Sequence, residues 1–146
     1  MGKNPRQSVR IEVSLFIHAT EDPEKVLKAV KNIFQLGHDE DIEFERSNLM
    51  GYHKNTITML KIIIREKVRV AAFLKNLFKK LEAQDKTNLC LEFKEYIDSE
   101  GTLYMRLDKQ EALNGKIRFC SVDPIHVKIK FNFLPKTLED LESFLI

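Results

Sequence analysis

Two short polar segments hold most of the side chains in this chain that could do chemistry. They are residues 51–55, Gly-Tyr-His-Lys-Asn, and residues 106–110, Arg-Leu-Asp-Lys-Gln. Each adjoins a stretch typical of a strand, and side chains at strand ends are not used up by packing. Their aromatic, cationic and amide groups suit a polyanion or an extended hydrogen-bonding partner. The expected contacts are Tyr52, His53, Lys54, Asn55, Arg106, Lys109 and Gln110.

Catalysis is the alternative use of the same residues. The best constellation is His53 with Asp108 and Lys109, joined by His126 if its strand lies nearby. General acid–base catalysis needs a histidine held near neutrality by a carboxylate, and a metal nuclease needs clustered carboxylates. The four histidines occur singly, and the aspartates share no metal-ligand spacing. We therefore expect no catalytic residues, no metal site and no cofactor.

The net charge of +2 conceals a strong separation of charge along the chain. Residues 54–80 contain eight basic residues and one acidic residue, whereas residues 21–45 contain eight acidic residues and three lysines. Lys67 and Arg69 belong to the basic stretch and join the expected phosphate contacts, because phosphates attract Lys and Arg without sequence readout. The alternative is an ordinary solvated helix face around an apolar stripe.

Aromatic side chains are expected on the outside near these cations. Phe16, Tyr52 and Tyr104 occupy outward or loop positions beside Arg10, His53 and Arg106. Single-stranded nucleic acids bind to such surfaces because bases stack on rings while cations hold the backbone.

The elements that must position these groups follow from apolar periodicity and from capping residues, for which Asp22, Asp108 and Thr137 are expected. Alternation predicts strands, and apolar residues at helical spacing predict helices. Irregular alternation near Met59 predicts either a bulge or burial on both faces, and Asn114-Gly115 is typical of a hairpin. The expected strands are 9–17, 42–49, 56–65, 102–108, 116–121 and 126–133, and the expected helices are 23–37, 67–81, 88–97 and 138–145.

Two strand–helix units followed by closing antiparallel strands indicate an α+β fold. We expect one domain over residues 1–146, with a core over about 8–134 and a short helix over 137–145. A single antiparallel or mixed sheet would carry its helices on one face and leave the other exposed. The outward side chains expected on that exposed face are Arg10, Arg106, Lys116, Arg118, Lys128 and Lys130.

Cysteine usage and hydropathy point to a cytoplasmic protein with no membrane partner. Cys90 and Cys120 lie in apolar surroundings without a metal-ligand pattern, so buried free thiols are expected. No stretch approaches the roughly 18 apolar residues that a membrane helix needs.

Three segments carry a resemblance to a known family. They are residues 20–26, Thr-Glu-Asp-Pro-Glu-Lys-Val, then residues 51–55, and then residues 103–110 with Ala112 and Gly115. In this order, over residues 9–133, the chain resembles an archaeal family of RNA-binding proteins predicted to be exosome subunits. That resemblance implies a fold like ribosomal protein L5, RNA as partner and a place in an exosome-type complex. A sister family of uncharacterised archaeal proteins shares the first segment and the Lys-Gln turn.

The sequence therefore favours a non-catalytic RNA-binding module. Phosphates would be held by Lys54, Lys67, Arg69, Arg106 and Lys109, and Tyr52, His53 and Gln110 would contact base or sugar. One alternative is an assembly subunit that forms a homodimer through the exposed sheet face. The other is an RNA-modifying enzyme that depends on His53 or Asp108.

Overall fold

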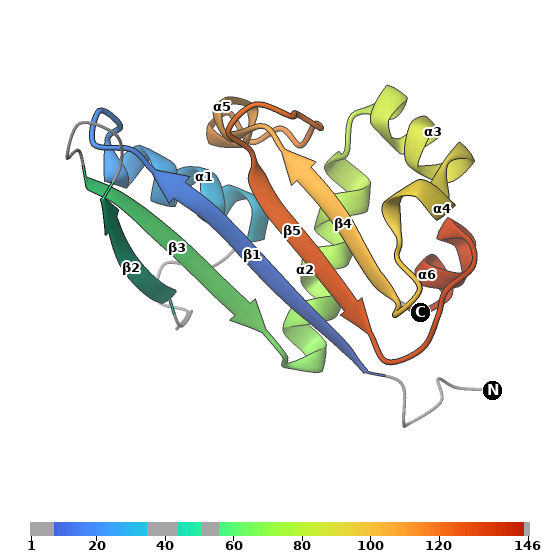
Figure 1. Cartoon of the computed structure of the whole chain (residues 1–146). Coiled ribbons are helices and arrows are strands. Elements are labelled where there is room, and N and C mark those ends of the chain that lie inside the picture. The colour runs from blue at the N-terminus through green and yellow to red at the C-terminus, as the bar shows by residue number, and fades with distance from the viewer. Residues whose placement is uncertain (1–7, 35–43, 51–55, 145–146) are drawn as a thin grey trace.

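Five strands form one antiparallel sheet in the computed structural model, which describes residues 8–34, 44–50 and 56–144 (Figure 1). The order across the sheet is β2-β3-β1-β5-β4, so the first strand is central and β2 and β4 are the edges. The strands are β1 (Val9–Ile17), β2 (Phe44–Met50), β3 (Thr56–Ile64), β4 (Thr102–Leu107) and β5 (Ile125–Phe131).

Helices cover one face of this sheet, and the face toward the viewer in Figure 1 carries none. They are α1 (Pro23–Phe34), α2 (Lys67–Lys80), α3 (Ala83–Leu91), α4 (Phe93–Tyr96), α5 (Lys109–Leu113) and α6 (Leu138–Phe144). The α+β class with helices on a single face is confirmed. The likeness to ribosomal protein L5 stays a prediction.

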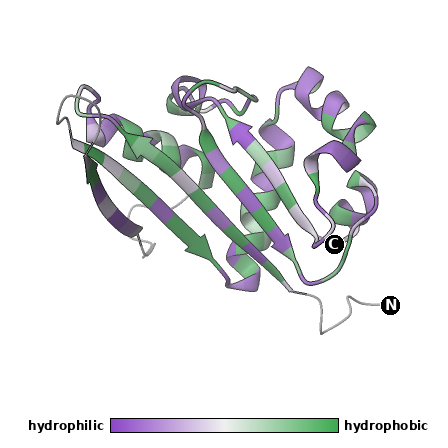
Figure 2. Cartoon of the chain, in the orientation of Figure 1, coloured by the Kyte–Doolittle hydropathy of each residue, from purple (hydrophilic) through white to green (hydrophobic). Residues whose placement is uncertain are grey.

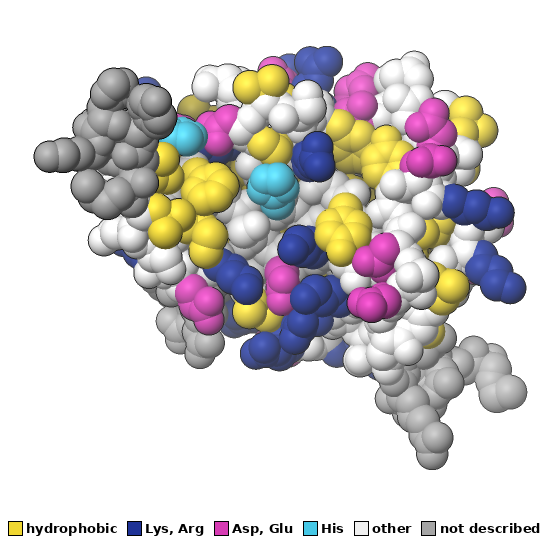
Figure 3. Space-filling model, in the orientation of Figure 1, with side chains coloured by type: hydrophobic (Ala, Val, Ile, Leu, Met, Phe, Trp, Pro, Cys, Tyr) yellow, Lys and Arg dark blue, Asp and Glu magenta, His cyan; other side chains and the backbone are white. Residues whose placement is uncertain are grey.

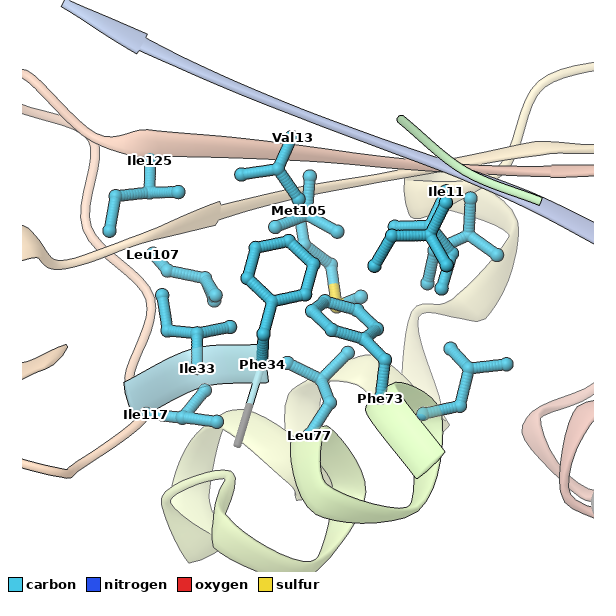
Figure 4. Close-up of a cluster of buried hydrophobic side chains, with 14 of the residues drawn as sticks. Ile11, Val13, Ile33, Phe34, Phe73, Leu77, Met105, Leu107, Ile117 and Ile125 are labelled. Atoms are coloured by element: carbon cyan, nitrogen blue, oxygen red, sulfur yellow. The ribbon is translucent and has the colours of Figure 1, made fainter. Parts of the chain in front are cut away.

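The core lies between the helices and the covered face of the sheet. Alternate residues of β1 and β5 are buried, which gives the banding of hydropathy along the strands in Figure 2. Phe34 of α1 and Phe73 of α2 meet beneath Val13, with ring centroids 4.8 Å apart (Figure 4). Burying each such side chain contributes about 1.5–3 kcal/mol, so the apolar alternation fixes which face the helices cover.

Strand β3 pairs without interruption, although its sequence alternates irregularly. Its register with β1 runs from Thr58 to Ile64, so of the two alternatives for this region the bulge is wrong. Leu60 is buried toward the helices, whereas Met59 and Ile63 are only half-buried on the open face. The alternation in the β3 sequence is therefore irregular because β3 also places apolar side chains on the open face.

The hairpin expected at Asn114-Gly115 is wrong. Asn114 is the C-cap of α5, and Gly115 follows with φ +78°, the left-handed conformation that commonly ends a helix. Ile117 and Phe119 then form only isolated bridges, so no strand covers residues 116–121. The helix expected over 88–97 is divided between α3 and α4.

Three expected caps are confirmed. The side chain of Asp22 accepts a hydrogen bond from the Glu24 N–H at 3.0 Å, and Asp108 accepts one from the Glu111 N–H at 3.0 Å. Thr137 Oγ1 accepts one from the Asp140 N–H at 3.2 Å.

Within the described part of the chain, no helix combines the length and apolar character that crossing a membrane requires.

Candidate nucleic-acid interface

The uncovered face of the sheet gathers cations from four strands. Residues paired across an antiparallel sheet point to the same side, and the register aligns Arg106 with His126, His126 with Ser14, and Ser14 with Lys61. A neighbouring row aligns Tyr104 with Lys128. We call this surface the basic face; its basic residues are Arg10, Lys61, Arg106, His126, Lys128 and Lys130 (Figure 3).

Glu12 lies among these cations and organises two of them. Its Oε1 is 3.3 Å from Arg10 Nη2 and 3.2 Å from Lys130 Nζ. Burial by itself would raise the pKa of Glu12, but Lys130, Lys61 and Arg10 together hold that pKa below its ordinary value. The carboxylate therefore stays ionised and leaves Lys61, Lys128 and Arg106 without an acidic partner within ion-pair distance among the described residues.

The positive charges of the basic face contribute to a lowered pKa of His126. Burial lowers its pKa most, and the nearby charges of Arg106 and Lys128 lower it further. A like charge nearby disfavours protonation. The imidazole is therefore a neutral group with a polar edge at neutral pH, placed between two cations.

Two aromatic side chains lie exposed on the same surface. Phe16 is 37% exposed and Tyr104 is 44% exposed. The Tyr104 hydroxyl donates to Asp98 Oδ2 at 3.0 Å, and Lys128 Nζ lies 5.8 Å from the centre of its ring. The ring of Tyr104 is thus fixed at one edge of the sheet beside a cation, an arrangement on which a base can stack.

The residues expected from the sequence do not all meet on this face. Arg106 belongs to it, whereas Lys67 and Arg69 are on α2, in the helix layer behind the sheet (Figure 1). Arg69 Nε is 3.3 Å from Glu66 Oε2. Gln110 is exposed on α5. The other expected contacts, Tyr52, His53, Lys54 and Asn55, lie outside the described residues.

Lys109 is held inside the molecule. Its Nζ donates to the Phe16 carbonyl oxygen at 2.7 Å, to Glu21 Oε1 at 3.0 Å and to Asp123 Oδ2 at 2.8 Å. Its side chain is only 12% exposed. An RNA phosphate would have to displace these partners, so the geometry favours a structural role over the expected phosphate contact.

The same cluster contains the only described group with metal-ligand types at ligand spacing. Ligand atoms of His18, Glu21 and Asp123 lie within 4.8 Å of one another. The ammonium of Lys109 is bonded to both carboxylates and supplies the positive charge that they attract. This arrangement is therefore an internal ion-pair cluster centred on lysine.

The catalytic constellation considered from the sequence is not assembled by the residues described. Asp108 caps α5, Lys109 is enclosed in its ion pairs, and His126 lies within β5 on the open face. Cys90 is exposed, so its expected burial is wrong, because it lies on the outer side of α3. Cys120 is partly buried.

Lys61, His126, Lys128 and Lys130 were missing from the contacts expected on the two polar segments. Their signal was present, because each alternates with buried apolar residues along its strand. Side-chain period two places such residues on the uncovered face. Lys128 and Lys130 were expected to point outward on this face, but not as contacts to RNA.

The fold and this surface define a class: an α+β protein with one helix-covered sheet face and one open, basic face bearing aromatic side chains. Proteins that bind single-stranded nucleic acids commonly offer such a surface. A sequence profile for the family described as RNA binding matches residues 10–131, and the chain belongs to this archaeal family.

Relatives share most of the chain. It is 38% identical to the RNA-binding protein PAB1135 of Pyrococcus abyssi over 135 residues, which are 91% of this chain and 88% of that protein. The crystal structure of AF2318 from Archaeoglobus fulgidus, described as DUF54, superposes with a TM-score of 0.72 at 29% identity, covering 92% of this chain and 94% of that one. The UPF0201 protein MK0399 of Methanopyrus kandleri is 26% identical over 140 residues, 92% of this chain and 80% of that protein. The expected family and its uncharacterised sister are both confirmed as relatives.

Proposed function

We propose that this chain is a non-catalytic, cytoplasmic RNA-binding protein that holds single-stranded RNA on the basic face. One observation carries the proposal: an uncovered sheet face presents six basic side chains and two exposed aromatic rings. Membership of a family described as RNA binding supports RNA as the polyanion.

Phosphates and bases would use different parts of this surface. Lys61, Arg106 and Lys128 would hold the phosphates, with the guanidinium of Arg106 suited to a two-pronged contact. Bases would stack on Tyr104 at the β4 edge and on Phe16 of the central strand β1, one row beyond Ser14 and His126. Since bases stack on rings without base-edge hydrogen bonds, this mode tolerates many sequences.

The loop expected to bind RNA stays within the proposal. Met50 and Thr56, which flank residues 51–55, are paired at the end of the sheet where Phe16 lies. Contacts from Tyr52, His53, Lys54 and Asn55 would extend the basic face beyond that end. Lys109 has a structural role in the proposal, and Lys67 and Arg69 lie outside the contact surface.

Charge reversal on two sides of the sheet tests the proposal. The double variant Lys61→Glu and Lys128→Glu changes the basic face, and Lys75→Glu with Lys79→Glu makes the same charge change on exposed positions of α2. Fluorescence anisotropy with a labelled single-stranded RNA at low salt should show at least a tenfold loss of affinity for the first variant only. A loss of more than 1.4 kcal/mol corresponds to this factor.

The α2 variant controls for net charge, and thermal unfolding of both variants controls for stability. Equal loss in the two variants would mean that attraction is diffuse and that the basic face is no binding site. If the wild-type protein does not bind RNA at low salt, the proposed RNA-binding function is wrong.

An assembly role is the second candidate, favoured by apolar side chains on the open face. Phe16, Met59 and Ile63 lie there together on β1 and β3, and Leu49 of β2 is 45% exposed. Such a patch would suit a homodimer or a complex of the exosome type, which the family resemblance implies. Light scattering measures the molecular mass of the protein in solution. A mass that rises with protein concentration and does not change when RNA is added would favour the assembly role.

A further inference from the structure

An open pocket of about 400 Å³ lies at the β4 edge of the basic face. This volume falls within the roughly 300–1,000 Å³ usual for small-molecule sites. Four of its seven lining residues carry aromatic or cationic side chains. The lining residues that matter here are Tyr96, Tyr104, Arg106, Phe119 and Cys120.

Three hydrogen bonds hold the outer wall of the pocket in place. The Asp108 N–H donates to the Arg118 carbonyl oxygen at 2.9 Å, and the Cys120 N–H donates to the Arg106 carbonyl oxygen at 3.0 Å. Asp85 of α3 accepts a hydrogen bond from the Phe119 N–H at 2.7 Å. The rings of Phe119 and Tyr96 lie 5.6 Å apart, so this wall is a fixed aromatic surface.

A short stretch of main chain faces this pocket. Edge strand β4 bonds outward at both ends: Thr102 to Asp98 and Arg106 to Cys120. Backbone groups two residues apart in a strand point the same way, so the N–H and C=O of Tyr104 also point outward. The bridge of Ile97 with Leu103 places the Tyr104 N–H against the main chain of Tyr96, so only the Tyr104 C=O has no hydrogen-bond partner among the described residues.

We propose that this pocket receives one base of the bound RNA, an inference that rests on the proposed function. The base would stack on the rings of Tyr96 and Phe119, and an N–H at its edge would face the C=O of Tyr104. Arg106, which belongs both to the pocket and to the basic face, would hold the adjoining phosphate. The RNA would thus cross the open face of the sheet and place one base in the pocket at the β4 edge.

The geometry favours a base over an added peptide strand. Strand addition needs a row of free backbone groups, and the bridges of Leu103 with Ile97 and of Leu107 with Phe119 leave only the Tyr104 C=O open between them. A base needs only one such acceptor beside an aromatic surface. The neighbouring cations also suit a phosphate better than a neutral peptide.

The two cysteines provide a direct test on the wild-type protein. Cys120 lines the pocket, whereas Cys90 is exposed on α3 and serves as the internal control. Alkylation by iodoacetamide, followed by mass spectrometry, should slow at least fivefold at Cys120 when a saturating oligouridylate or oligoadenylate of about ten nucleotides is bound. The rate at Cys90 should not change. An abasic sugar–phosphate strand of equal length should leave Cys120 unprotected.

A ring-removing substitution gives the second test. Phe119→Leu should weaken RNA affinity by about 5- to 150-fold, the range for loss of one stacked base. The salt dependence should not change, because no phosphate contact is lost. Phe119→Tyr keeps the ring and should bind like wild type.

The outcomes separate this inference from the proposed function. RNA that binds through Lys61 and Lys128 yet leaves Cys120 unprotected overturns the base pocket alone. Protection of Cys120 that grows with protein concentration in the absence of RNA overturns it in favour of a second copy. Absence of any RNA binding to the wild-type protein removes both proposals.

Discussion

At the scale of single residues, Lys109 shows how position changes the role of a side chain. From the sequence it is an exposed cation in a polar segment, but in the fold it bonds to Glu21, Asp123 and the Phe16 carbonyl oxygen. These partners lie 88, 14 and 93 residues away in sequence. Lys109 therefore ties the end of β1 to the segments around α5 and β5.

Replacing Lys109 by methionine should destabilise the fold by about 1–3 kcal/mol. The substitution keeps the shape of the aliphatic chain and leaves two carboxylates without their cation, which costs roughly 3–5 kcal/mol when fully buried. Asp123 is 38% exposed, so water offsets part of the loss. Urea unfolding at neutral pH measures the change, and Lys116→Met, at an exposed position, is the matched control. An equal change in the two variants would contradict the structural role of Lys109.

The penalty of this substitution should depend on pH. Burial by itself would raise the pKa of Asp123, but hydrogen bonds from Lys109 and His18 hold that pKa below its ordinary value of 3.8. A lowered carboxyl pKa stabilises the fold above the ordinary value, and this contribution is lost as the pH falls through the lowered pKa. The difference between wild type and Lys109→Met should therefore shrink below pH 3.8.

At the scale of elements, two glycines with similar backbone angles separate conformation from packing. Gly101 has φ +88° before β4, and Gly115 has φ +78° after α5. A Cβ at Gly101 would lie 2.7 Å from the Phe133 carbonyl oxygen and 3.1 Å from that of Phe131, whereas a Cβ at Gly115 would have no atom within 4 Å. Only the first position also requires glycine for close packing.

Alanine at these positions should therefore cost different amounts. Gly115→Ala should lose about 1–2 kcal/mol, the cost of the left-handed conformation. Gly101→Ala should lose more, because the main chain at the end of β5 must move away from residue 101. Thermal or urea unfolding of the two variants measures the difference, and equal losses would mean that the contact at Gly101 relaxes freely.

Elements also show where local patterns were sufficient and where they failed. Alternation over Val9–Ile17 predicts β1 to the residue, and Asp22 with Pro23 predicts the start of α1. Asn114-Gly115 fails because the same dipeptide ends a helix when α5 precedes it. The helical choice for α5 depends on packing against α1, which lies far away in sequence.

At the scale of the whole molecule, the number of cations on the binding surface limits the salt dependence of RNA binding. Five cations lie on the basic face beside the neutral His126, and Lys54 would add a sixth; single-stranded nucleic acids lose affinity with a logarithmic salt slope of about −0.7 for each neutralised phosphate. The slope for this protein should accordingly be no steeper than about −4. A steeper slope would mean that cations outside the basic face also attract the RNA.

The contribution of one cation to the slope can be measured. Arg106→Ala should make the slope shallower by about 0.7, while Lys75→Ala on α2 should leave it unchanged. Anisotropy titrations over a series of NaCl concentrations measure both. A slope that responds equally to the two substitutions would contradict binding on the basic face.

The sequence by itself determined the elements whose signals are local: the strands that alternate, the helices with apolar stripes, and the caps at Asp22, Asp108 and Thr137. It also indicated that Lys128 and Lys130 point outward, because alternation assigns faces within one strand. Only the tertiary structure decided which strands are neighbours, and so placed Lys61 and Arg106 in one row with His126. It likewise enclosed Lys109 and built the pocket from Tyr96, Tyr104 and Phe119. The reason is physical: periodicity is set by the backbone over a few residues, whereas neighbours across a sheet are set by pairings between residues as much as 122 positions apart, since Val9 pairs with Phe131.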